Sequence, residues 1–417
     1  MSDSGPPTGA VAPRPFVSII LVIFLPFAAG FFMSYLLRTV NAVIAPNLVQ
    51  DIGLSAGDLG FLTAAYFLSF ALMQLPVGVT LDRWGPRRVQ SALLTIAVAG
   101  ALVFAMAETR TMLFVGRAMI GIGCAGGLMA SLKAITLWFP RERWPLINGF
   151  FMATGGLGAL VATAPIEAAL HLTDWRGVFV GLAIAAAGAS LLIFTVVPEK
   201  PGSAAPGRLS EQIAAVGRIF RDPFFWCVGP VAVIPLGISS GIQTLWAGPW
   251  LRDVGGLDRH EVAEHLFAIA IALTAGFVLA GIVTDLLIRK GMRLTQILGG
   301  SVVLLFTVKL LLALQLWPPN LALWVLFGLC ANSAIVYFPI LNQHFPADQV
   351  ARVNTATNVL NFGVAFLSQA AIGWIIDLWP ALGDGRYPAE AYRWAFLAVI
   401  ATEVLAFLWF LKPVRRR

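Results

Sequence analysis

The sequence predicts an all-α integral membrane protein with twelve transmembrane helices. Hydrophobic residues make up 59% of the 417 residues, and charged residues only 12%, about half the charged share of an ordinary soluble domain. A soluble globule needs a polar surface and cannot hide so much apolar area, so the excess must face lipid. This composition excludes a soluble enzyme, a secreted disulfide scaffold, a fibrous protein and a disordered chain.

Long runs without Asp, Glu, Lys or Arg locate the helices. Such a run can cross a hydrocarbon layer of roughly 30 Å as a helix, which satisfies its own backbone hydrogen bonds. The runs are continuously apolar and do not alternate as barrel strands do. The first run is too long for a signal peptide and lacks a cleavage site, so we interpret it as an uncleaved span. We expect spans at 16–45, 57–80, 88–107, 111–138, 144–170, 175–197, 224–251, 260–288, 293–316, 320–344, 350–379 and 388–411.

The 28 Lys and Arg residues are distributed unevenly between the two sides of the membrane. With the N-terminus in the cytoplasm, eighteen fall in cytoplasmic segments, six in external segments and four inside spans. This excess predicts a protein of the cytoplasmic (inner) membrane with both termini cytoplasmic. The net charge of +7 then reflects topology and contact with anionic lipid heads, not nucleic-acid binding. We expect a monomer.

The residues that usually hold metals or carry out catalysis are sparse. Cys124, Cys227 and Cys330 all fall in predicted spans without a spaced pair, and the four His are scattered. We therefore predict no disulfide framework, no metal site and no cofactor. A membrane-embedded enzyme, such as a lipid transferase, would need catalytic His, Asp or Glu clustered near one interface. The sequence shows no such cluster, so we do not expect an enzyme.

A polar segment rich in Pro, Gly and Ser divides the chain into two halves of six spans. We place an N-terminal bundle at 1–198, a cytoplasmic linker at 199–222 and a C-terminal bundle at 223–417. Two short motifs recur between the halves: Gly78, Asp82 and Arg87 as Gly281, Asp285 and Lys290, and Phe139, Pro140 and Asn148 as Phe345, Pro346 and Asn354. Two related halves are typical of a transporter that rocks around a site at the membrane midplane.

The loop between the second and third spans reads Gly-Val-Thr-Leu-Asp-Arg-Trp-Gly-Pro-Arg-Arg. Asp82 can pair with Arg83, Arg87 or Arg88, and these cations can also reach carbonyls at helix ends. Pairs made in one arrangement of the halves and broken in the other would form a latch, so we assign gating roles to these four residues. We assign the same role to Asp285 at the repeated position.

This loop resembles the signature of the major facilitator superfamily at every characteristic position. Arg117, Gly121 and Gly123 resemble the second motif of that superfamily, and Trp175-Arg176 is a common companion. The resemblance extends over essentially the whole chain. It implies two pseudo-symmetric six-helix bundles and transport by alternating access.

Two cations inside the spans are candidates for binding a substrate. Arg38 lies in the first span with Tyr35 one turn before it on the same face, and Lys133 lies in the fourth. A buried cation is costly and usually faces a cavity or a partner. A cationic cavity with few acids favours an anionic substrate.

The surroundings of these cations resemble the anion:cation symporter family. The segment Tyr35-Leu36-Leu37-Arg38 and the Lys five residues before Trp138-Phe139-Pro140 are similar to that family, and organophosphate:phosphate antiporters share the first-span Arg. The resemblance implies that Arg38 binds the anionic group of the substrate and that Lys133 assists. Leu37 and Cys124 stand where the symporters often carry acids. Protons and a counter-anion therefore both stay open as coupling partners.

Two embedded acids remain to be placed. Glu167 lies about one turn from the external end of the fifth span, where water can reach it, and is our candidate for proton coupling. Glu403 in the twelfth span is expected to pair with Lys309 in the ninth. Both of these spans are peripheral in the folds that the chain resembles, so we interpret that pair as structural.

The second half offers polar and aromatic groups in place of charges. Gln243 and Trp246 are one turn apart on the seventh span, and Asn358 and Asn361 belong to a polar stripe on the eleventh. Trp246 and Tyr337 are candidates for packing against the apolar body of a substrate. The Asn stripe could line the cavity or join helices, since unpaired amides are costly in lipid.

We therefore predict a secondary transporter for a small organic anion, with a carboxylate favoured. The alternative is a proton-driven exporter of drugs or other amphiphilic molecules. Such exporters typically carry adjacent Gly and Pro in the fifth span, whereas Pro165 here follows Ala164. A transporter-like receptor that binds its ligand without moving it also stays open.

Overall fold

The computed structural model describes residues 16–140, 143–199, 209–316, 321–346, 349–382 and 385–411. Within these ranges, eleven helices are long and apolar enough to cross a membrane. One of them, α4 (Ala56–Ala105), has 50 residues and contains two spans, because Gly85 interrupts it with φ 77° and ψ 165°. The predicted twelve-span, all-helical fold is thus confirmed.

The helices up to Val196 are called the N-terminal bundle here. It comprises α1 (Phe16–Ile19), the π-helix η1 (Ile20–Phe24), α2 (Leu25–Thr39), α3 (Asn41–Ile52), α4, α5 (Arg110–Cys124), α6 (Gly127–Trp138), α7 (Trp144–Val161), α8 (Ala164–Leu170) and α9 (Trp175–Val196). Several predicted spans consist of two helices in sequence. The first contains α2 and the start of α3, which runs on to Ile52 beyond the predicted end at 45. The fourth contains α5 and α6, and the fifth contains α7 and α8.

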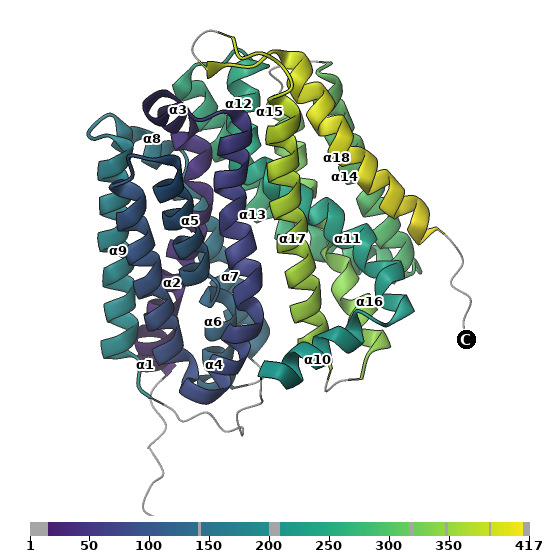
Figure 1. The fold of residues 1–417 in the computed structure, drawn as a ribbon. Coiled ribbons are helices and arrows are strands. Elements are labelled where there is room, and N and C mark those ends of the chain that lie inside the picture. Colours follow the sequence, from purple (N-terminus) through teal and green to yellow (C-terminus); the bar gives the residue numbers. More distant parts are fainter. Residues whose placement is uncertain are drawn as a thin grey trace, which may run out of the picture.

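The helices from Pro223 onward are called the C-terminal bundle. It comprises α11 (Pro223–Gly241), the π-helix η3 (Ile242–Trp246), α12 (Ala247–Asp253), α13 (Arg259–Arg289), α14 (Leu294–Leu314), α15 (Leu321–Cys330), the 3₁₀-helix η4 (Ser333–Val336), α16 (Tyr337–His344), α17 (Val350–Ile376) and α18 (Ala389–Phe410). In Figure 1 the two bundles stand side by side, and α4 packs against α17 where they meet.

The predicted linker contains a helix that we did not anticipate. Residues 200–208 lie outside the described ranges, but α10 (Leu209–Ile219) follows them and contacts both α4 and α17. Ala215, Val216 and Ile219 are buried on one side of α10, at the spacing of an amphipathic helix. In Figure 1 this helix lies across the lower end of the molecule.

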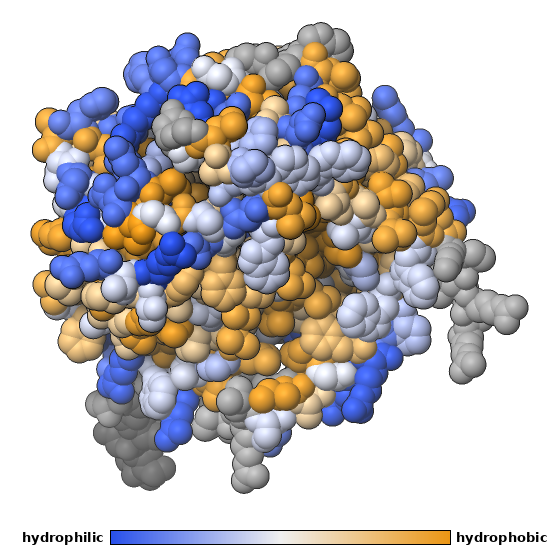
Figure 2. All heavy atoms as spheres, turned by 45° about the horizontal axis from the view of Figure 1, so that its top comes forward, coloured by the Kyte–Doolittle hydropathy of each residue, from blue (hydrophilic) through white to orange (hydrophobic). Residues whose placement is uncertain are grey.

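The surface agrees with a membrane setting. Large apolar side chains are exposed on the flanks of both bundles, among them Leu72, Ile184, Val278 and Leu405. Figure 2 shows hydrophilic residues gathered over one end of the molecule and hydrophobic residues on the flanks below it. We call this the Ser55 end, because Ser55, Arg110 and Asp377 lie there. The opposite end is called the Asp82 end.

Candidate functional site

Arg38 is a half-buried cation without a carboxylate partner. Its guanidinium carbon lies 3.9 Å from the centroid of the Tyr35 ring, as expected for residues one turn apart on α2. Its Nε is buried and makes no hydrogen bond, and none of the ion pairs within the described ranges includes Arg38. The guanidinium is therefore stabilised by an aromatic face but not neutralised.

A second arginine, Arg117, is buried and binds the backbone of α2 at Arg38. It is fully buried on α5, and its Nη1 and Nη2 donate to the carbonyl oxygens of Leu37 and Arg38 at 2.6 and 2.9 Å. Its guanidinium also lies 5.0 Å from the centroid of Tyr66. Arg117 thus fixes the backbone of α2 beside the first cation. The sequence places Arg117 in a motif but gives no sign of this role at the site.

No acid enters this cluster from the position where the symporters often carry one. Cys124, at the end of α5, lies beside Ser34 and Tyr66. The side chains around Arg38 and Arg117 are therefore neutral aromatic, hydroxyl and thiol groups. Two guanidinium groups in such surroundings create a positive potential, which the low local dielectric strengthens.

Lys133 has a partner other than the one we expected. Its Nζ forms an ion pair with Asp82 of α4. Lys133 lies on α6 (Gly127–Trp138), which follows α5 after a short break at Ala125 and Gly126. The ammonium group is paired in this arrangement, and the assisting role of Lys133 in anion binding stays a prediction.

The basic residues of the signature loop also have partners, in the N-terminal bundle or in the segment that directly follows it. Arg87 donates from Nε to the carbonyl oxygen of Phe194 at 2.8 Å, and Arg88 pairs with Glu199 at 2.6 Å. The guanidinium carbon of Arg83 lies 5.3 Å from the centroid of the Trp84 ring. In the C-terminal bundle, Asp285 pairs with Arg289, one turn later on α13, at 2.8 Å.

The aromatic candidates of the C-terminal bundle are buried in helix packing. The π-helix η3 shifts the register of the seventh span, so that Gln243 is half-buried whereas Trp246 is 1% exposed. Trp246 donates from Nε1 to the carbonyl oxygen of Gln369 at 3.2 Å. Tyr337 is 2% exposed and stacks on Phe338. Contact between either ring and a substrate would require these helices to move.

The Asn stripe on α17 retains unsatisfied polar atoms. Asn358 and Asn361 are half-buried, and the Oδ1 atoms of Asn361 and Asn354 have no hydrogen-bond partner in the described part of the chain. The ring of Phe362, next to this stripe, packs against the ring of Phe70 of α4, with 4.3 Å between the two centroids. Both roles of the stripe, lining a cavity and joining helices, stay open.

The expected pair of embedded charges is confirmed. Lys309 and Glu403 are both fully buried, and Nζ lies 2.5 Å from Oε1. Lys309 also donates to the carbonyl oxygen of Pro235 on α11 at 2.9 Å. The pair therefore ties α14, α18 and α11 together within one bundle, away from Arg38.

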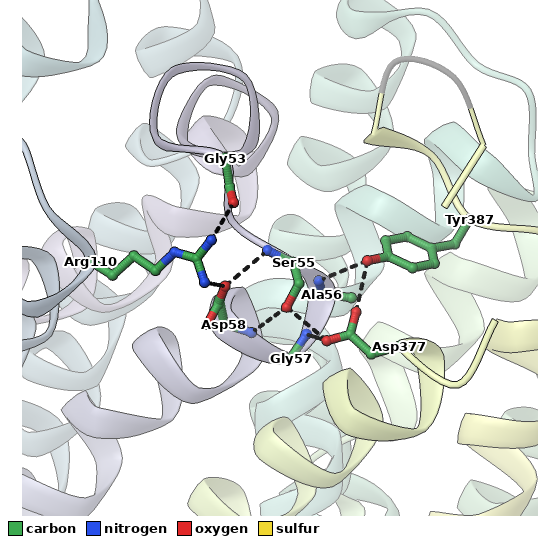
Figure 3. Close-up of polar contacts among 8 residues, drawn as sticks. All are labelled: Gly53, Ser55, Ala56, Gly57, Asp58, Arg110, Asp377 and Tyr387. Carbon is green, nitrogen blue, oxygen red and sulfur yellow. Dashed lines mark hydrogen bonds and ion pairs between the residues drawn. The ribbon is translucent and has the colours of Figure 1, made fainter. Parts of the chain in front are cut away.

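Polar contacts at the Ser55 end join the two bundles (Figure 3). Asp377, which caps α17, accepts from Ser55 Oγ at 2.7 Å and from the amide of Gly57 at 2.8 Å. Tyr387 donates to Asp377 at 2.7 Å and accepts from the amide of Ala56 at 3.1 Å. The carboxylate thus binds the positive end of the α4 helix dipole. Burial raises the pKa of Tyr387 to about 12, so its hydroxyl remains a donor at neutral pH.

Glu167 takes part in a second contact between the bundles at the same end. Its Oε1 lies 2.7 Å from Nε of Arg259 on α13, and Arg259 Nη2 donates to Asn47 Oδ1 on α3 at 2.9 Å. A cavity of about 310 Å³ adjoins this contact, lined by α3, α8, α12 and α13. The sequence points to this acid, but its partner lies in the other bundle and has no local signal.

Comparisons with known proteins agree with this architecture. The family model described as "Major Facilitator Superfamily" matches residues 27–369. A probable sulfoacetate transporter of Cupriavidus necator is 26% identical over 62% of this chain and 64% of its own length. The hexuronate transporter of Escherichia coli K12 is 25% identical, again over 62% and 64%. Each alignment thus spans less than two thirds of the relative.

Among solved structures, a bacterial homologue of the human lysosomal transporter Spinster superposes with a TM-score of 0.75. It is 18% identical and covers 95% of this chain and 96% of its own, and it was solved in an inward-facing and unoccupied conformation. At this identity the likeness concerns the fold alone.

Proposed function

The chain belongs to the major facilitator superfamily and is a secondary transporter, and we propose that its substrate is a small organic anion carrying a carboxylate. The observation that carries this proposal is the unneutralised Arg38, with its buried and unpartnered Nε. A carboxylate would supply the missing negative charge and accept two parallel hydrogen bonds from the planar guanidinium. The two relatives named above, a hexuronate and a probable sulfoacetate transporter, act on substrates of this class.

The remaining groups suit the other parts of such a substrate. Tyr35 offers an aromatic face beside the guanidinium. The free Oδ1 of Asn361 and the neighbouring Asn358 can accept hydrogen bonds from substrate hydroxyls, and Gln243 is half-buried on the same bundle. A substrate held by Arg38 in one bundle and by α17 in the other would couple its binding to the movement of both.

We assign the Ser55 end to the outside and the Asp82 end to the cytoplasm, following the distribution of Lys and Arg. The polar contacts of Asp377 and Arg259 then close the protein toward the outside. In the opposite arrangement these contacts break, and Asp82 and its basic neighbours become available to the C-terminal bundle. The protein would lie in the cytoplasmic membrane with both termini inside, and either protons or a counter-anion would be coupled to the substrate.

The first experiment identifies a ligand. Purified protein is screened by thermal shift against hexuronates, sulfoacetate, phosphate esters and neutral sugars, because a ligand that binds the native state raises its melting temperature. We expect carboxylates to stabilise the protein and neutral sugars to have no effect. A neutral sugar as the best ligand would overturn the proposal.

The second experiment tests the role of Arg38 with the ligand found. Arg38→Ala should weaken binding by about 2–5 kcal/mol, the usual cost of truncating one member of a buried charge pair. Arg38→Lys should bind weakly because it lacks the planar fork. Arg110→Ala is the matched control, since it removes an exposed Arg at the Ser55 end and should leave affinity unchanged. Isothermal titration of the three variants gives the comparison.

A further inference from the structure

Arg259 holds two elements of the opposite bundle at once. From the first turn of α13 it binds Glu167 of α8 through Nε at 2.7 Å and Asn47 of α3 through Nη2 at 2.9 Å. The carboxylate side chain is 4% exposed and the guanidinium side chain 44%. One member of this contact is thus sheltered within the N-terminal bundle, and the other arrives from outside it.

The carboxylate is only half satisfied. Oε1 receives Arg259, but Oε2 is buried and has no hydrogen-bond partner in the described residues. A buried carboxylate oxygen without a donor is costly when it is ionised. The ionised form therefore depends on Arg259, and it loses its main stabilisation when the bundles separate at this end.

Other charged side chains surround Glu167. His171 on the same segment approaches Oε1 only to 3.8 Å and is largely exposed. Arg252, Asp258 and Arg386 line the neighbouring cavity, and Arg252 pairs with Asp253.

The helices packed against α8 carry few other charged groups. Helix α7 carries no ionisable side chain, and α9 carries Arg176 alone, which pairs with Asp51 of α3. Beside Arg259, α13 carries His260, which pairs with Glu264 at 3.3 Å, and His265, whose Nδ1 lies 2.8 Å from the carbonyl oxygen of Glu261.

We propose that Glu167 is a proton-binding site that opens the outer face: protonation of its carboxylate releases Arg259 and favours separation of the two bundles at the Ser55 end. This inference rests on the proposed orientation of the chain. The closed arrangement holds the ionised carboxylate, so lowering the external pH shifts the equilibrium toward the open one. The adjoining cavity of about 310 Å³ gives water access to the site as the contact loosens.

The proposed role differs from the proton coupling that the sequence suggested for Glu167, which stays a prediction. Glu167 lies at the outer end of the fifth span, so in this proposal its proton arrives from the outside and returns to the outside. The proton need not cross the membrane with the substrate. Glu167 instead sets how external pH biases the transporter between its two arrangements.

The test measures the separation of the bundles directly, without any substrate. Spin labels are placed on Leu172→Cys and Leu382→Cys, which are exposed at the Ser55 end in different bundles. Cys227 is replaced, since Cys124 and Cys330 are buried. Pulsed electron–electron double resonance then gives the ratio of long to short distances at about pH 7 and about pH 4, on either side of the usual carboxyl range.

In the parent protein the ratio of open to closed should rise on the order of five-fold at the lower pH, the effect of one modest ion pair. Glu167→Gln should show the higher ratio at both pH values, because the amide mimics the protonated acid. Arg259→Gln should behave in the same way and serves as the second variant. His171→Gln is the matched control and should keep the full pH response.

Two outcomes would overturn the proposal. One is a parent protein whose distances do not change with pH. The other is a pH response that persists in Glu167→Gln and disappears in His171→Gln, which would place the sensor on the exposed imidazole. A failure of the anion proposal would instead appear in ligand binding to Arg38 and would leave these distances unaffected.

Discussion

The two ends of the molecule use their polar residues differently. At the Ser55 end, Asp377 and Arg259 of the C-terminal bundle bind groups of the N-terminal bundle. At the Asp82 end, Asp82 and Arg87 make contacts within the N-terminal bundle, and Arg88 pairs with Glu199 at the start of the linker. The polar contacts of the Ser55 end therefore join the two bundles in this arrangement, and the latch proposed for the signature loop would belong to the other arrangement.

The apolar contacts follow the same division. Along the α4–α17 seam near the Ser55 end, a Cβ added to Gly373 would lie 2.5 Å from the carbonyl oxygen of Ala56, and one added to Gly60 would lie 2.6 Å from that of Gln369. Only glycine permits backbones to approach so closely. The two helices are thus fitted to each other at this end in the closed arrangement.

The largest effect is expected from Asp377→Ala. This change leaves the amide of Gly57 and the hydroxyls of Ser55 and Tyr387 without their acceptor, at a cost of about 3 kcal/mol to the closed arrangement. Spin labels on Leu172→Cys and Leu382→Cys should then show mostly long distances between the two bundles. An unchanged distance distribution would mean that the carboxylate does not hold the bundles together.

A somewhat smaller effect is expected from Gly373→Ala. The added methyl group meets backbone and cannot be accommodated by a rotamer change, so the closed arrangement should lose about 1–2 kcal/mol. Gly363→Ala on the same helix is the control, because nothing lies within 4 Å of the added atom. Equal spin-label distances between the bundles in the two variants would show that the close α4–α17 contact has no role in closure.

A third change tests the Asp82 end. Asp82→Asn releases Lys133 and removes the acid from the signature loop, which should bias the arrangement of the bundles by about 1 kcal/mol without unfolding them. Transport should therefore slow much more than the yield of folded protein falls. Parallel losses of folded protein and flux would assign Asp82 a structural role only.

The smallest effect is expected from Arg110→Ala. Its contacts with Asp58 and Gly53 lie within the N-terminal bundle, and its side chain is 54% exposed. Exposed ion pairs contribute less than about 1 kcal/mol, so both distances and melting temperature should hardly change. A marked separation of the bundles in this variant would contradict the account, because it would mean that a contact within one bundle also holds the two bundles together.

Sequence patterns predicted the features that depend on a single helix or on overall composition. The twelve spans follow from apolar runs, and the stacking of Arg38 on Tyr35 follows from spacing along α2. The pairing of Lys309 with Glu403 followed because two embedded opposite charges have few other solutions in lipid.

Contacts between helices were harder to predict, since they depend on distances that no periodicity encodes. Lys133 follows the break between α5 and α6, and Trp246 lies within the π-helix η3, and neither irregularity was predicted from the sequence. The partner of Glu167 belongs to the other bundle, and the role of Arg117 depends on carbonyl oxygens exposed at the end of α2. The local sequence around Glu167 and Arg117 does not indicate which groups they bind.

Uptake into proteoliposomes tests the central claim most directly. The labelled anion identified in the screen is offered to vesicles containing equal amounts of folded parent protein, Arg38→Ala or Arg110→Ala. We expect the parent and Arg110→Ala to accumulate the anion and Arg38→Ala to lose uptake roughly thirty-fold or more, the equivalent of about 2 kcal/mol. Undiminished uptake by Arg38→Ala would contradict the assignment of an anionic substrate to this cation.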